Sequence, residues 1–535
     1  MPTALLSVYN KEGIDYFARQ LTELGWRIIA SGGTAQEIKK AGVPVTDVAE
    51  LVGGDSILGH RVVTLSREVH AGLLAKDTKE DRNELNKLGI PWINLVCVDL
   101  YPLQEEINGC NSSRESVIEK TDIGGPTIIR SAAKGRRIVI CDPYDRKKVI
   151  EWLKSGQSKG DEFITELIAK AEAVVADYCL ASARYHSCGT YEGIIGKRKL
   201  ECLYGENAWQ ASAAFYSTKI STAASADPLT LDNFNVITGT PPSYNNLCDI
   251  DRLLQTVTHI SAAFAVNRGD IPLIAVGCKH GNPCGVATGK DPLLVIQKMI
   301  KGDTRAIFGG LVMVNFPVSK IIAEELIAYL MPKGEHRLLD GIVAPSFSKE
   351  AISILKRKGD KCRFLVNPAL GFLSLDSVSR FRYVRGGFLY QPNYTFILNL
   401  KDPQLKKIGK LTPREEDNLL LAWAIGSTSN SNTITLVKDG YLIGNGVGQQ
   451  DRVGGCALAV QRARDAGHET SGAFAYSDSF FPFTDGPKVL VEAGVKAIFA
   501  SSGSVRDPEI QNFCRGKKMV LYLFPDKLGR GFFGH

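Results

Sequence analysis

A lysine and a histidine, Lys279 and His280, stand side by side at the end of a strongly apolar stretch. That stretch, Ile271–Cys278, has the composition of a buried strand, and the turn after it is rich in small residues, from Gly281 to Gly285. A lysine beside a histidine disfavours a second positive charge, so the imidazole stays neutral, as a general base must be. An isolated pair of this kind is usually a surface feature, but its place at a strand end favours a catalytic role.

Three segments near the N-terminus could act on an anionic substrate. Ser31-Gly32-Gly33-Thr34 follows an apolar run and precedes a helical pattern, so its backbone N–H groups could hold a phosphate, although many plain strand-to-helix turns look the same. Asp122 and Lys134 frame a second glycine turn and could serve acid–base chemistry, but the segment alone is better explained by a capped turn and a solvated lysine. Tyr101 follows an apolar strand, where it is either a ligand contact or a core-edge residue.

The C-terminal half holds three further candidate segments. Asn432 precedes a strand-like run, and its amide could orient an amine or a carboxamide through two hydrogen bonds. A glycine turn, Gly446–Gly448, leads into polar side chains up to Arg452. The run Asp478–Asp485 concentrates three aromatic residues between two acids, which suits either the wall of a pocket for a planar ligand or a hydrophobic loop that closes a core.

Strands must alternate with helices to position these residues. Strand-like runs at the N-terminus are Ala4–Val8, Trp26–Ala30, Val45–Val48, Ile93–Leu100 and Arg137–Cys141, with amphipathic helical patterns between them, such as Gly13–Leu24 and Ala35–Ala41. This alternation predicts an α/β fold with a parallel sheet. Buried strands are again expected in the C-terminal half, at Ile271–Cys278, Gly309–Val314 and Val495–Ala500.

The composition is that of a globular protein with several domains. The 535 residues are 44% hydrophobic and 23% charged, the net charge is +7, and no basic cluster favours nucleic acid. The twelve cysteines form no CxxC pair, so no metal site is indicated and reduced thiols in the cytoplasm are expected. No secretory signal and no apolar run of about 18 residues is found, so no membrane span is expected.

The motifs, taken in order, resemble those of the bifunctional family that joins AICAR transformylase to IMP cyclohydrolase, the purine biosynthesis protein PurH family. The matching N-terminal blocks are Ser31–Ala35, Gly59–Arg61, His70–Gly72, Leu100–Pro102, Asp122–Thr127 and Ala132–Lys134. The matching C-terminal blocks are Tyr204–Asn207, Lys279–Gly285, Phe308–Gly310, Ser431-Asn432, Gly448–Gln450, Ser477-Asp478, Phe480–Phe483 and Gly503-Ser504. The resemblance implies an N-terminal Rossmann-like, methylglyoxal-synthase-like domain over residues 1–195. It implies cytidine-deaminase-like α/β units without catalytic zinc over residues 200–535, expected as two similar subdomains.

The resemblance also implies two reactions and their residues. A formyl group moves from 10-formyltetrahydrofolate to the 5-amino group of AICAR, with His280 as the base, Lys279 as the stabilising cation and Asn432 as the positioning amide. Formyl-AICAR then closes to IMP with loss of water, at a site that Asp122, Tyr101 and Lys134 match. A homodimer is implied, with the transformylase sites across its interface. The residues that match substrate contacts are Ser31, Gly32, Gly33, Thr34, Arg61, Thr64, Tyr204, Asp303, Gln449, Arg452, Phe480, Pro482, Phe483, Asp485, Arg530, Phe533 and His535.

Several positions depart from the family pattern at expected ligand contacts. Val63 and Ser66 stand where the family has a lysine and a histidine, Asp99 where it has an asparagine, and Leu203 where it has an arginine. The serine before Phe308 is missing, and the C-terminal arginine, Arg530, lies one residue early. These departures leave two alternatives to the bifunctional enzyme. One is a paralogue that keeps a single activity, more readily formyl transfer, or acts on a related carboxamide nucleotide, and the other is a silent nucleotide- or folate-binding protein.

Overall fold

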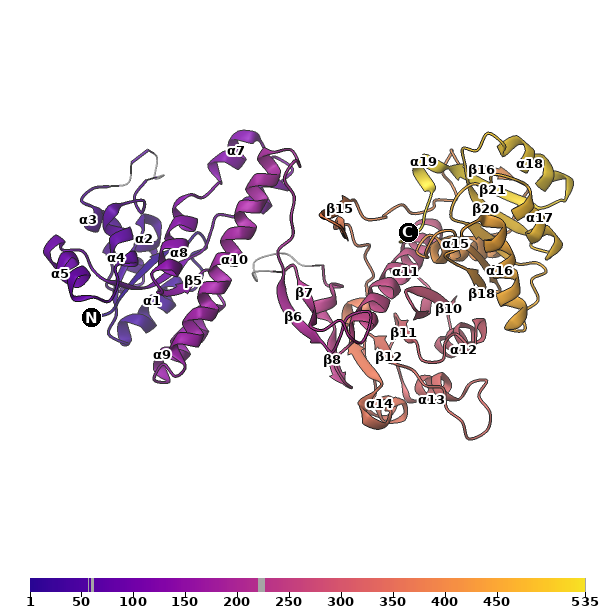
Figure 1. Ribbon diagram of the computed structural model, residues 1–535, viewed down its shortest axis with the longest axis horizontal. Coiled ribbons are helices and arrows are strands. Elements are labelled where there is room, and N and C mark those ends of the chain that lie inside the picture. The colour runs from indigo at the N-terminus through magenta and orange to yellow at the C-terminus, as the bar shows by residue number, and fades with distance from the viewer. Residues whose placement is uncertain (56, 59–61, 220–226, 535) are drawn as a thin grey trace. The chain divides into compact units, whose positions relative to one another are not determined.

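The computed structural model describes residues 1–55, 57–58, 62–219 and 227–534, and the chain divides into two compact units (Figure 1). The N-terminal unit comprises Met1–Lys197 with Tyr216–Ala226, and the C-terminal unit comprises Arg198–Phe215 with Asp227–His535. None of the helices in the described part of the chain is long and apolar enough to cross a membrane.

The N-terminal unit is built on a five-stranded sheet in the order β3-β2-β1-β4-β5, and every neighbouring pair is parallel. The strands are β1 (Thr3–Ser7), β2 (Arg27–Ala30), β3 (Thr46–Asp47), β4 (Ile93–Val98) and β5 (Ile138–Ile140). The helices are α1 (Ile14–Glu23), α2 (Gly32–Lys40), α3 (Val48–Val52), α4 (Arg67–Leu74), α5 (Lys79–Leu88), α6 (Leu103–Ile107), α7 (Arg114–Glu119), α8 (Gly124–Lys134), α9 (Asp145–Lys154) and α10 (Gly160–His186). The strand order reverses direction between β1 and β4, and ligands of open α/β sheets bind at such a point, beyond the carboxyl ends of the strands.

Both faces of this sheet are buried, which explains the continuous apolar runs in its strands. Side chains alternate between the two faces: Ala4 and Leu6 pack with α1, α2 and α9, whereas Leu5 packs with α4, α8 and part of α10. The strand expected at Val45–Val48 is shorter than predicted. Asp47 accepts a hydrogen bond from the Ala49 N–H at 3.0 Å and caps α3, so the chain turns helical at Val48.

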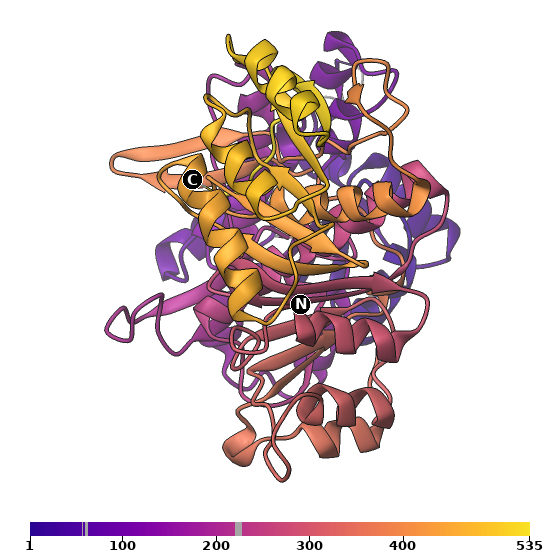
Figure 2. The ribbon, with the colours of Figure 1, turned by 90° about the vertical axis from the view of Figure 1, so that its right-hand side faces the viewer.

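The C-terminal unit contains a twelve-stranded sheet whose two halves repeat one topology (Figures 1 and 2). The first half runs β8-β13-β12-β11-β9-β10 and the second half runs β16-β21-β20-β19-β17-β18, with β10 paired to β18 where they meet. The first-half strands are β8 (Asn235–Thr238), β9 (Leu273–Lys279), β10 (Asn282–Gly289), β11 (Leu311–Val314), β12 (Gly341–Ala344) and β13 (Arg363–Val366). The second-half strands are β16 (Lys406–Ile408), β17 (Ile434–Lys438), β18 (Tyr441–Gly446), β19 (Phe474–Ser477), β20 (Ala497–Ser502) and β21 (Val520–Pro525).

The helices follow the same repeat and cover both faces of this sheet. One face carries α11 (Tyr244–Arg268) and α15 (Pro413–Gly426), which share one apolar core. The other face carries α12 (Pro292–Gly302), α13 (Lys320–Ala328) and α14 (Lys349–Leu355) over the first half, and α16 (Arg452–Asp465), α17 (Asp485–Glu492) and α18 (Asp507–Gly516) over the second half. Outside the large sheet lie the pairs β6 (Lys197–Cys202) with β7 (Ala213–Ser217) and β14 (Arg380–Val384) with β15 (Gly387–Gln391), and the short α19 (Asp526–Gly529).

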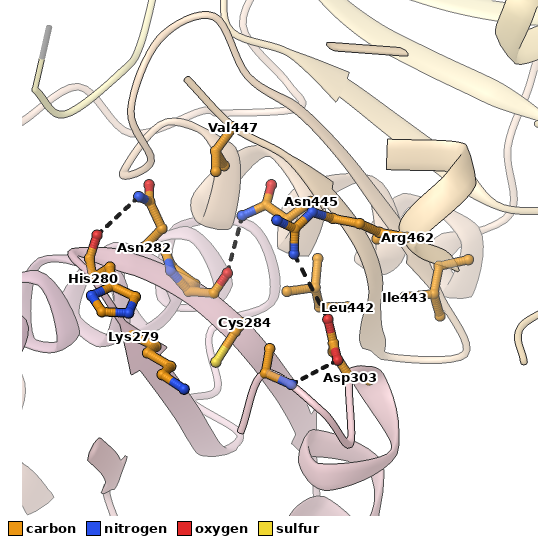
Figure 3. A pocket seen from close by; sticks show the side chains of 14 residues that line it. Lys279, His280, Asn282, Cys284, Asp303, Leu442, Ile443, Asn445, Val447 and Arg462 are labelled. Carbon is orange, nitrogen blue, oxygen red and sulfur yellow. Dashed lines mark hydrogen bonds and ion pairs between the residues drawn. The ribbon is translucent and has the colours of Figure 1, made fainter. Parts of the chain in front are cut away.

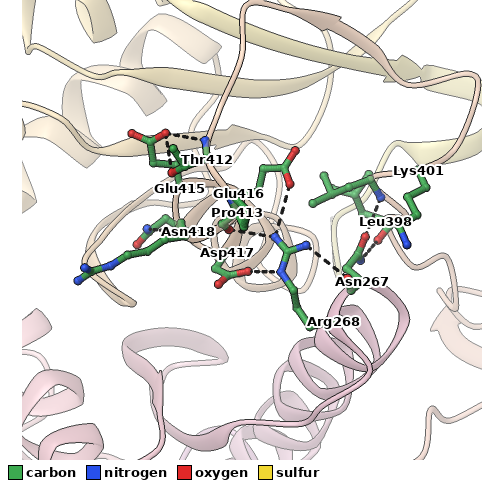
Figure 4. Close-up of polar contacts among 12 residues, drawn as sticks. Asn267, Arg268, Leu398, Lys401, Thr412, Pro413, Glu415, Glu416, Asp417 and Asn418 are labelled. Carbon is green, nitrogen blue, oxygen red and sulfur yellow. Dashed lines mark hydrogen bonds and ion pairs between the residues drawn. The ribbon is translucent and has the colours of Figure 1, made fainter.

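Charged residues join the end of α11 to the start of α15 (Figure 4). Arg268, in the last turn of α11, donates to the Asp417 carboxylate at 2.6 Å and to the Pro413 carbonyl at 3.0 Å. Asn267 donates to the Leu398 carbonyl at 2.7 Å and accepts from the Leu400 N–H at 2.7 Å. A cation at a helix C-terminus and acids at a helix N-terminus also complement the two helix dipoles. These contacts join the C-terminal end of α11 to the N-terminal end of α15.

Candidate functional site

The turn between β9 and β10 carries Lys279 and His280 and borders a cavity of about 320 Å³ (Figure 3). His280 and Gly281 both have positive φ angles, 54° and 68°, which makes the turn tight and leaves His280 exposed at its tip. The Gly281 N–H donates to the Asp249 carboxylate at 2.6 Å, which anchors the turn to α11. Lys279 Nζ donates to the Phe308 carbonyl at 2.9 Å. Both side chains therefore line one cavity from the end of a buried strand.

The loop before β17 lies against this turn. The Asn430 N–H donates to Asn282 Oδ1 at 3.1 Å, and Asn445 Nδ2 donates to the Pro283 carbonyl at 3.2 Å. Asn432 Nδ2 donates to the Gln449 carbonyl at 2.8 Å, so this amide is already held in place. The structure thus brings the loop that contains Asn432 to the turn that contains Lys279 and His280, and Gln449 holds the Asn432 side chain.

A buried ion pair holds the loop that contains Ser431 and Asn432 in place. Arg452 Nη2 donates to Asp478 Oδ1 at 3.2 Å, and Ser431 Oγ donates to Asp478 Oδ2 at 2.6 Å. The Asp478 side chain is completely buried, and burial raises the pKa of its carboxyl group despite the opposing effects of Ser431 and Arg452. The ion pair joins the start of α16 to the end of β19 and holds Ser431, the neighbour of Asn432.

We expect the Asp478→Ala substitution to lower the free energy of unfolding by about 3 kcal/mol, because it leaves a largely buried guanidinium without its counter-ion. Urea unfolding measures this loss, with Asp465→Ala, an exposed acid at the end of α16, as the matched control that changes stability by less than about 0.5 kcal/mol. Equal effects of the two substitutions would contradict the structural role of the pair.

The raised pKa of Asp478 also predicts a pH dependence. A carboxyl group whose pKa is higher in the folded protein binds its proton more tightly there, so its contribution to stability is lost as pH rises through the folded pKa. We therefore expect the stability of the unsubstituted protein, relative to Asp478→Asn, to fall as the pH rises from about 4 to 7. A difference that stays constant over this range would contradict the raised pKa.

Of the remaining predicted residues that the structure describes in the C-terminal unit, it places only Asp303 beside the cavity. Asp303 lines the cavity, accepts from the Ala306 N–H at 2.9 Å and lies 3.8 Å from Arg462. Phe480, Pro482 and Phe483 follow β19, and Asp485 lies in the first turn of α17. Arg530 pairs with Asp526 at 2.9 Å. Tyr204 follows β6 beside Leu203, which is 84% exposed, and His535 lies outside the described residues.

Two arginines that sequence reasoning missed hold Phe533. The Arg252 and Arg380 guanidinium carbons lie 4.3 and 4.2 Å from the Phe533 ring centroid, an arrangement stabilised by cation–π attraction. Arg252 also donates to Asn430 Oδ1 at 2.9 Å, so the C-terminal segment contacts the Asn430–Asn432 loop. Both arginines lie in segments where no motif draws attention to them, and only the fold brings them to Phe533.

In the N-terminal unit, the Ser31–Thr34 turn starts α2 at the carboxyl end of β2. Thr34 Oγ1 accepts from the Val8 N–H at 3.2 Å and from Lys11 Nζ at 3.1 Å. Lys11 was not singled out from the sequence, yet it adds a cation to this turn, and burial lowers its pKa against the opposing effect of Asp99. A cation beside a helix N-terminus suits an anion.

An uncompensated carboxylate at position 99 would repel a phosphate, but the Asp99 carboxylate has partners of its own. It accepts hydrogen bonds from the backbone N–H groups of Tyr9 and Asn10, and Arg146 lies 4.0 Å away. Burial raises the pKa of Asp99 against these stabilising contacts. Asp99 therefore ties the loop after β1 to the end of β4.

Asp122 lies just before α8 and accepts from the Gly125 N–H at 2.8 Å. Burial raises the pKa of Asp122, and its hydrogen bonds to backbone N–H groups, among them that of Tyr101, oppose the shift. Thr64 approaches this turn closely, because a Cβ atom on Gly124 would lie 3.1 Å from its hydroxyl. Lys134 is different: it occupies the last turn of α8, about 15 Å along the helix from Gly124. Arg61 lies outside the described residues.

Two protein-family models match this chain. The model of the AICARFT/IMPCHase bienzyme matches residues 132–462, more than half of the chain, and the model of the MGS-like domain matches residues 13–127. The chain belongs to the AICARFT/IMPCHase bienzyme family. This confirms the predicted α/β fold with a methylglyoxal-synthase-like domain at the N-terminus.

Two relatives of this family align over almost the whole chain, and both are named bifunctional purine biosynthesis protein PurH. The relative from Anoxybacillus flavithermus is 35% identical over 95% of this chain and 95% of its own. The relative from Prochlorococcus marinus is 33% identical over 97% of this chain and 98% of its own. A solved structure, "Crystal structure of ForH", is 32% identical and covers 36% of this chain and 100% of its own, with a TM-score of 0.32, too low to support an argument.

Membership in the AICARFT/IMPCHase bienzyme family assigns both activities to this chain. It is a bifunctional AICAR formyltransferase and IMP cyclohydrolase of purine biosynthesis, with a small nucleotide and a formyl-donor folate as substrates. The comparisons favour this assignment over the paralogue with a single activity, since the two bifunctional relatives align over 95% and 97% of the chain.

Proposed function

We propose that formyl transfer takes place at the β9–β10 turn, with 10-formyltetrahydrofolate as the donor and the 5-amino group of AICAR as the acceptor. One observation carries this proposal: Lys279 and His280 line the same cavity, and Asn282 ties their turn to the loop that holds Asn432. A base and a cation line the cavity, and the loop that carries the amide of Asn432 lies against their turn, which suits acyl transfer to an amine.

The proposed chemistry gives His280 one role and Lys279 two. The amine nitrogen of AICAR attacks the formyl carbon, a C–N bond forms, and the carbonyl electron pair moves to the oxygen. His280 accepts the amine proton, and Lys279 stabilises the negative charge on that oxygen. The bond from the formyl carbon to the folate nitrogen then breaks, and that nitrogen takes up a proton with the help of Lys279. The products are formyl-AICAR and tetrahydrofolate.

The surrounding residues would hold the substrates. Asn432 would orient the amine and the carboxamide, and Asp478 would keep its loop in place through Ser431. The aromatic residues after β19 would form a wall for a planar ring. The other proposed substrate contacts in this unit are Tyr204, Asp303, Gln449, Arg452, Asp485, Arg530, Phe533 and His535.

Ring closure would take place in the N-terminal unit, at the carboxyl edge of its parallel sheet. The Ser31–Thr34 turn would bind the phosphate, with Arg61 and Thr64 as further contacts. Asp122 and Tyr101 would act on the formyl and carboxamide groups, and Lys134 is retained as a proposed participant. The positions of these segments support the placement: the Ser31–Thr34 turn follows β2, Tyr101 follows β4, and Asp122 lies just before α8.

We also propose that the enzyme works in the cytoplasm as a homodimer whose transformylase sites lie across the subunit interface. The twelve free cysteines, seven of them buried, suit a reducing compartment. The exposed apolar side chains of the β14–β15 pair, among them Tyr383 and Leu389, suit a surface that a second copy covers.

The test measures the two reactions separately on the full chain. With AICAR and 10-formyltetrahydrofolate we expect release of tetrahydrofolate, and with formyl-AICAR we expect IMP well above the uncatalysed rate. 5-Formyltetrahydrofolate serves as the matched donor control and should give less than about 1% of the rate, because its formyl group is on the other nitrogen. Equal rates with both donors would contradict the proposed donor, and no tetrahydrofolate release would contradict the proposed site.

A further inference from the structure

Two tyrosines and a lysine meet at the point of the N-terminal sheet where the strand order reverses. Tyr9 follows β1 and Tyr101 follows β4, and their ring centroids lie 5.3 Å apart with the ring planes at 63°. Lys120 Nζ lies 3.5 Å from the Tyr9 hydroxyl and 5.2 Å from its ring centroid. The tyrosines are 44% and 41% exposed, so a ligand can reach them.

Hydrogen bonds to two side chains, Asp99 and Tyr178, fix the backbone around this cluster. The Asp99 carboxylate accepts from the N–H groups of Tyr9 and Asn10 and so determines the position of the first ring. The Tyr178 hydroxyl donates to the Lys120 carbonyl at 3.1 Å and accepts from the Asp122 N–H at 2.7 Å. The backbone that carries Tyr9, Lys120 and Asp122 is therefore fixed before any substrate binds, a condition for electrostatic stabilisation of a transition state.

The charges of this cluster suit a reaction in which an oxygen becomes negative. Burial raises the pKa of Tyr101, as does the Asp122 carboxylate, whereas the Lys120 ammonium lowers it. Two other positions, 63 and 134, correspond to lysines of the family pattern, but neither places a cation beside these tyrosines. Val63 packs against the apolar cluster on one face of the sheet, and Lys134 lies at the far end of α8.

We propose that Lys120 and Tyr9 complete the ring-closure site, Lys120 as a positioning residue that supplies positive charge beside the Tyr9 hydroxyl, and Tyr9 as an aromatic wall for the imidazole ring of the nucleotide. This inference rests on the proposed location of ring closure. In that step the carboxamide nitrogen attacks the formyl carbon, a C–N bond forms, and the carbonyl electron pair moves to the formyl oxygen. That oxygen takes up two protons from the reacting nitrogens by way of the site and leaves as water, while the C=N bond of the new ring forms.

The test compares Lys120→Met with Lys120→Arg in the full chain, using formyl-AICAR as the substrate. We expect Lys120→Met to lower kcat for IMP formation roughly tenfold with KM changed less than about threefold, and Lys120→Arg to keep at least about a third of kcat, because the charge is needed and the amine is not. Lys87→Met, at an exposed lysine in α5, is the matched control and should change neither constant. The formyl-transfer rate of the same samples should stay within about twofold in all three variants.

A second substitution keeps the proposal testable if Lys120→Met does not fold. Tyr9→Leu removes the aromatic wall but leaves the backbone N–H that donates a hydrogen bond to Asp99. We expect this substitution to raise KM for formyl-AICAR about tenfold. The inference is overturned if the unsubstituted protein forms IMP while Lys120→Met and Tyr9→Leu do so equally well. If Asp122→Asn left IMP formation from formyl-AICAR unchanged, the proposed location of ring closure would be wrong, and the inference would fail with it.

Discussion

Replacing His280 with alanine is expected to lower the rate of formyl transfer by roughly 1,000-fold, the middle of the range of about 100- to 10,000-fold for removal of a general base. His280 stands exposed at the tip of a turn whose backbone Asp249 anchors, so alanine removes the imidazole without loss of packing. Tetrahydrofolate release with saturating AICAR measures the effect. The conversion of formyl-AICAR to IMP should stay within about twofold, because its proposed residues lie in the other unit.

The matched control for this prediction is His336→Ala, at an exposed histidine of the same unit that does not line the cavity. It should leave both rates unchanged. If His280→Ala retained more than about a tenth of the formyl-transfer rate, another group would have to accept the amine proton, since a base in this position normally contributes a factor of at least 100.

The strands could be predicted from sequence where burial on both faces gives long apolar runs. Ile93–Leu100 was predicted as a strand and β4 spans Ile93–Val98, and Ile271–Cys278 was predicted and β9 spans Leu273–Lys279. Short strands could not be distinguished in this way: β12 is only Gly341–Ala344, and a run of four apolar residues fits a helix as well. The repeated topology of the two halves also depends on pairings between distant segments, which periodicity within one strand does not encode.

The candidate site could be predicted only as far as local motifs reach. Lys279 and His280 were found because a charged pair ends an apolar run, and the structure places both beside one cavity. Lys120 and Arg252 carry no such signal, because neither belongs to a local motif. Lys120 is identified only by its contact with Tyr9, and Arg252 only by its contact with Phe533, and both partners are distant in the sequence. Contacts between residues about 100 to 280 positions apart are set by the fold, not by local pattern.

The N-terminal departures show how the structure changes a prediction made from sequence. Val63, in place of a lysine, suggested a lost cation, and Asp99 suggested repulsion of the substrate. In the structure Val63 packs on an apolar cluster, so a lysine restored there would have to be partly buried. Asp99 instead organises the Tyr9 loop through two backbone hydrogen bonds. The two departures are therefore compatible with a ring-closure site that is rearranged rather than lost.

Replacing Asp122 with asparagine is expected to lower ring closure about 100-fold and to leave formyl transfer within about twofold. The amide oxygen can still accept the Gly125 N–H, which lies 2.8 Å from the carboxylate, so the turn before α8 should keep its conformation. The amide cannot exchange a proton, however, and a buried carboxyl group with a raised pKa is suited to do so. IMP formation from formyl-AICAR measures the effect, with Glu115→Gln in α7 as the matched control at an exposed acid.

The His280→Ala and Asp122→Asn variants together give a stricter test of the two sites. Each variant alone should make almost no IMP from AICAR and 10-formyltetrahydrofolate, for opposite reasons. Mixed in equal amounts, they should make IMP at a substantial rate, because formyl-AICAR released by Asp122→Asn is a substrate for the intact ring-closure site of His280→Ala. Accumulated formyl-AICAR should be detectable with Asp122→Asn alone and absent with His280→Ala alone. A mixture that stayed inactive while formyl-AICAR accumulated would mean that the two substitutions do not affect separate sites.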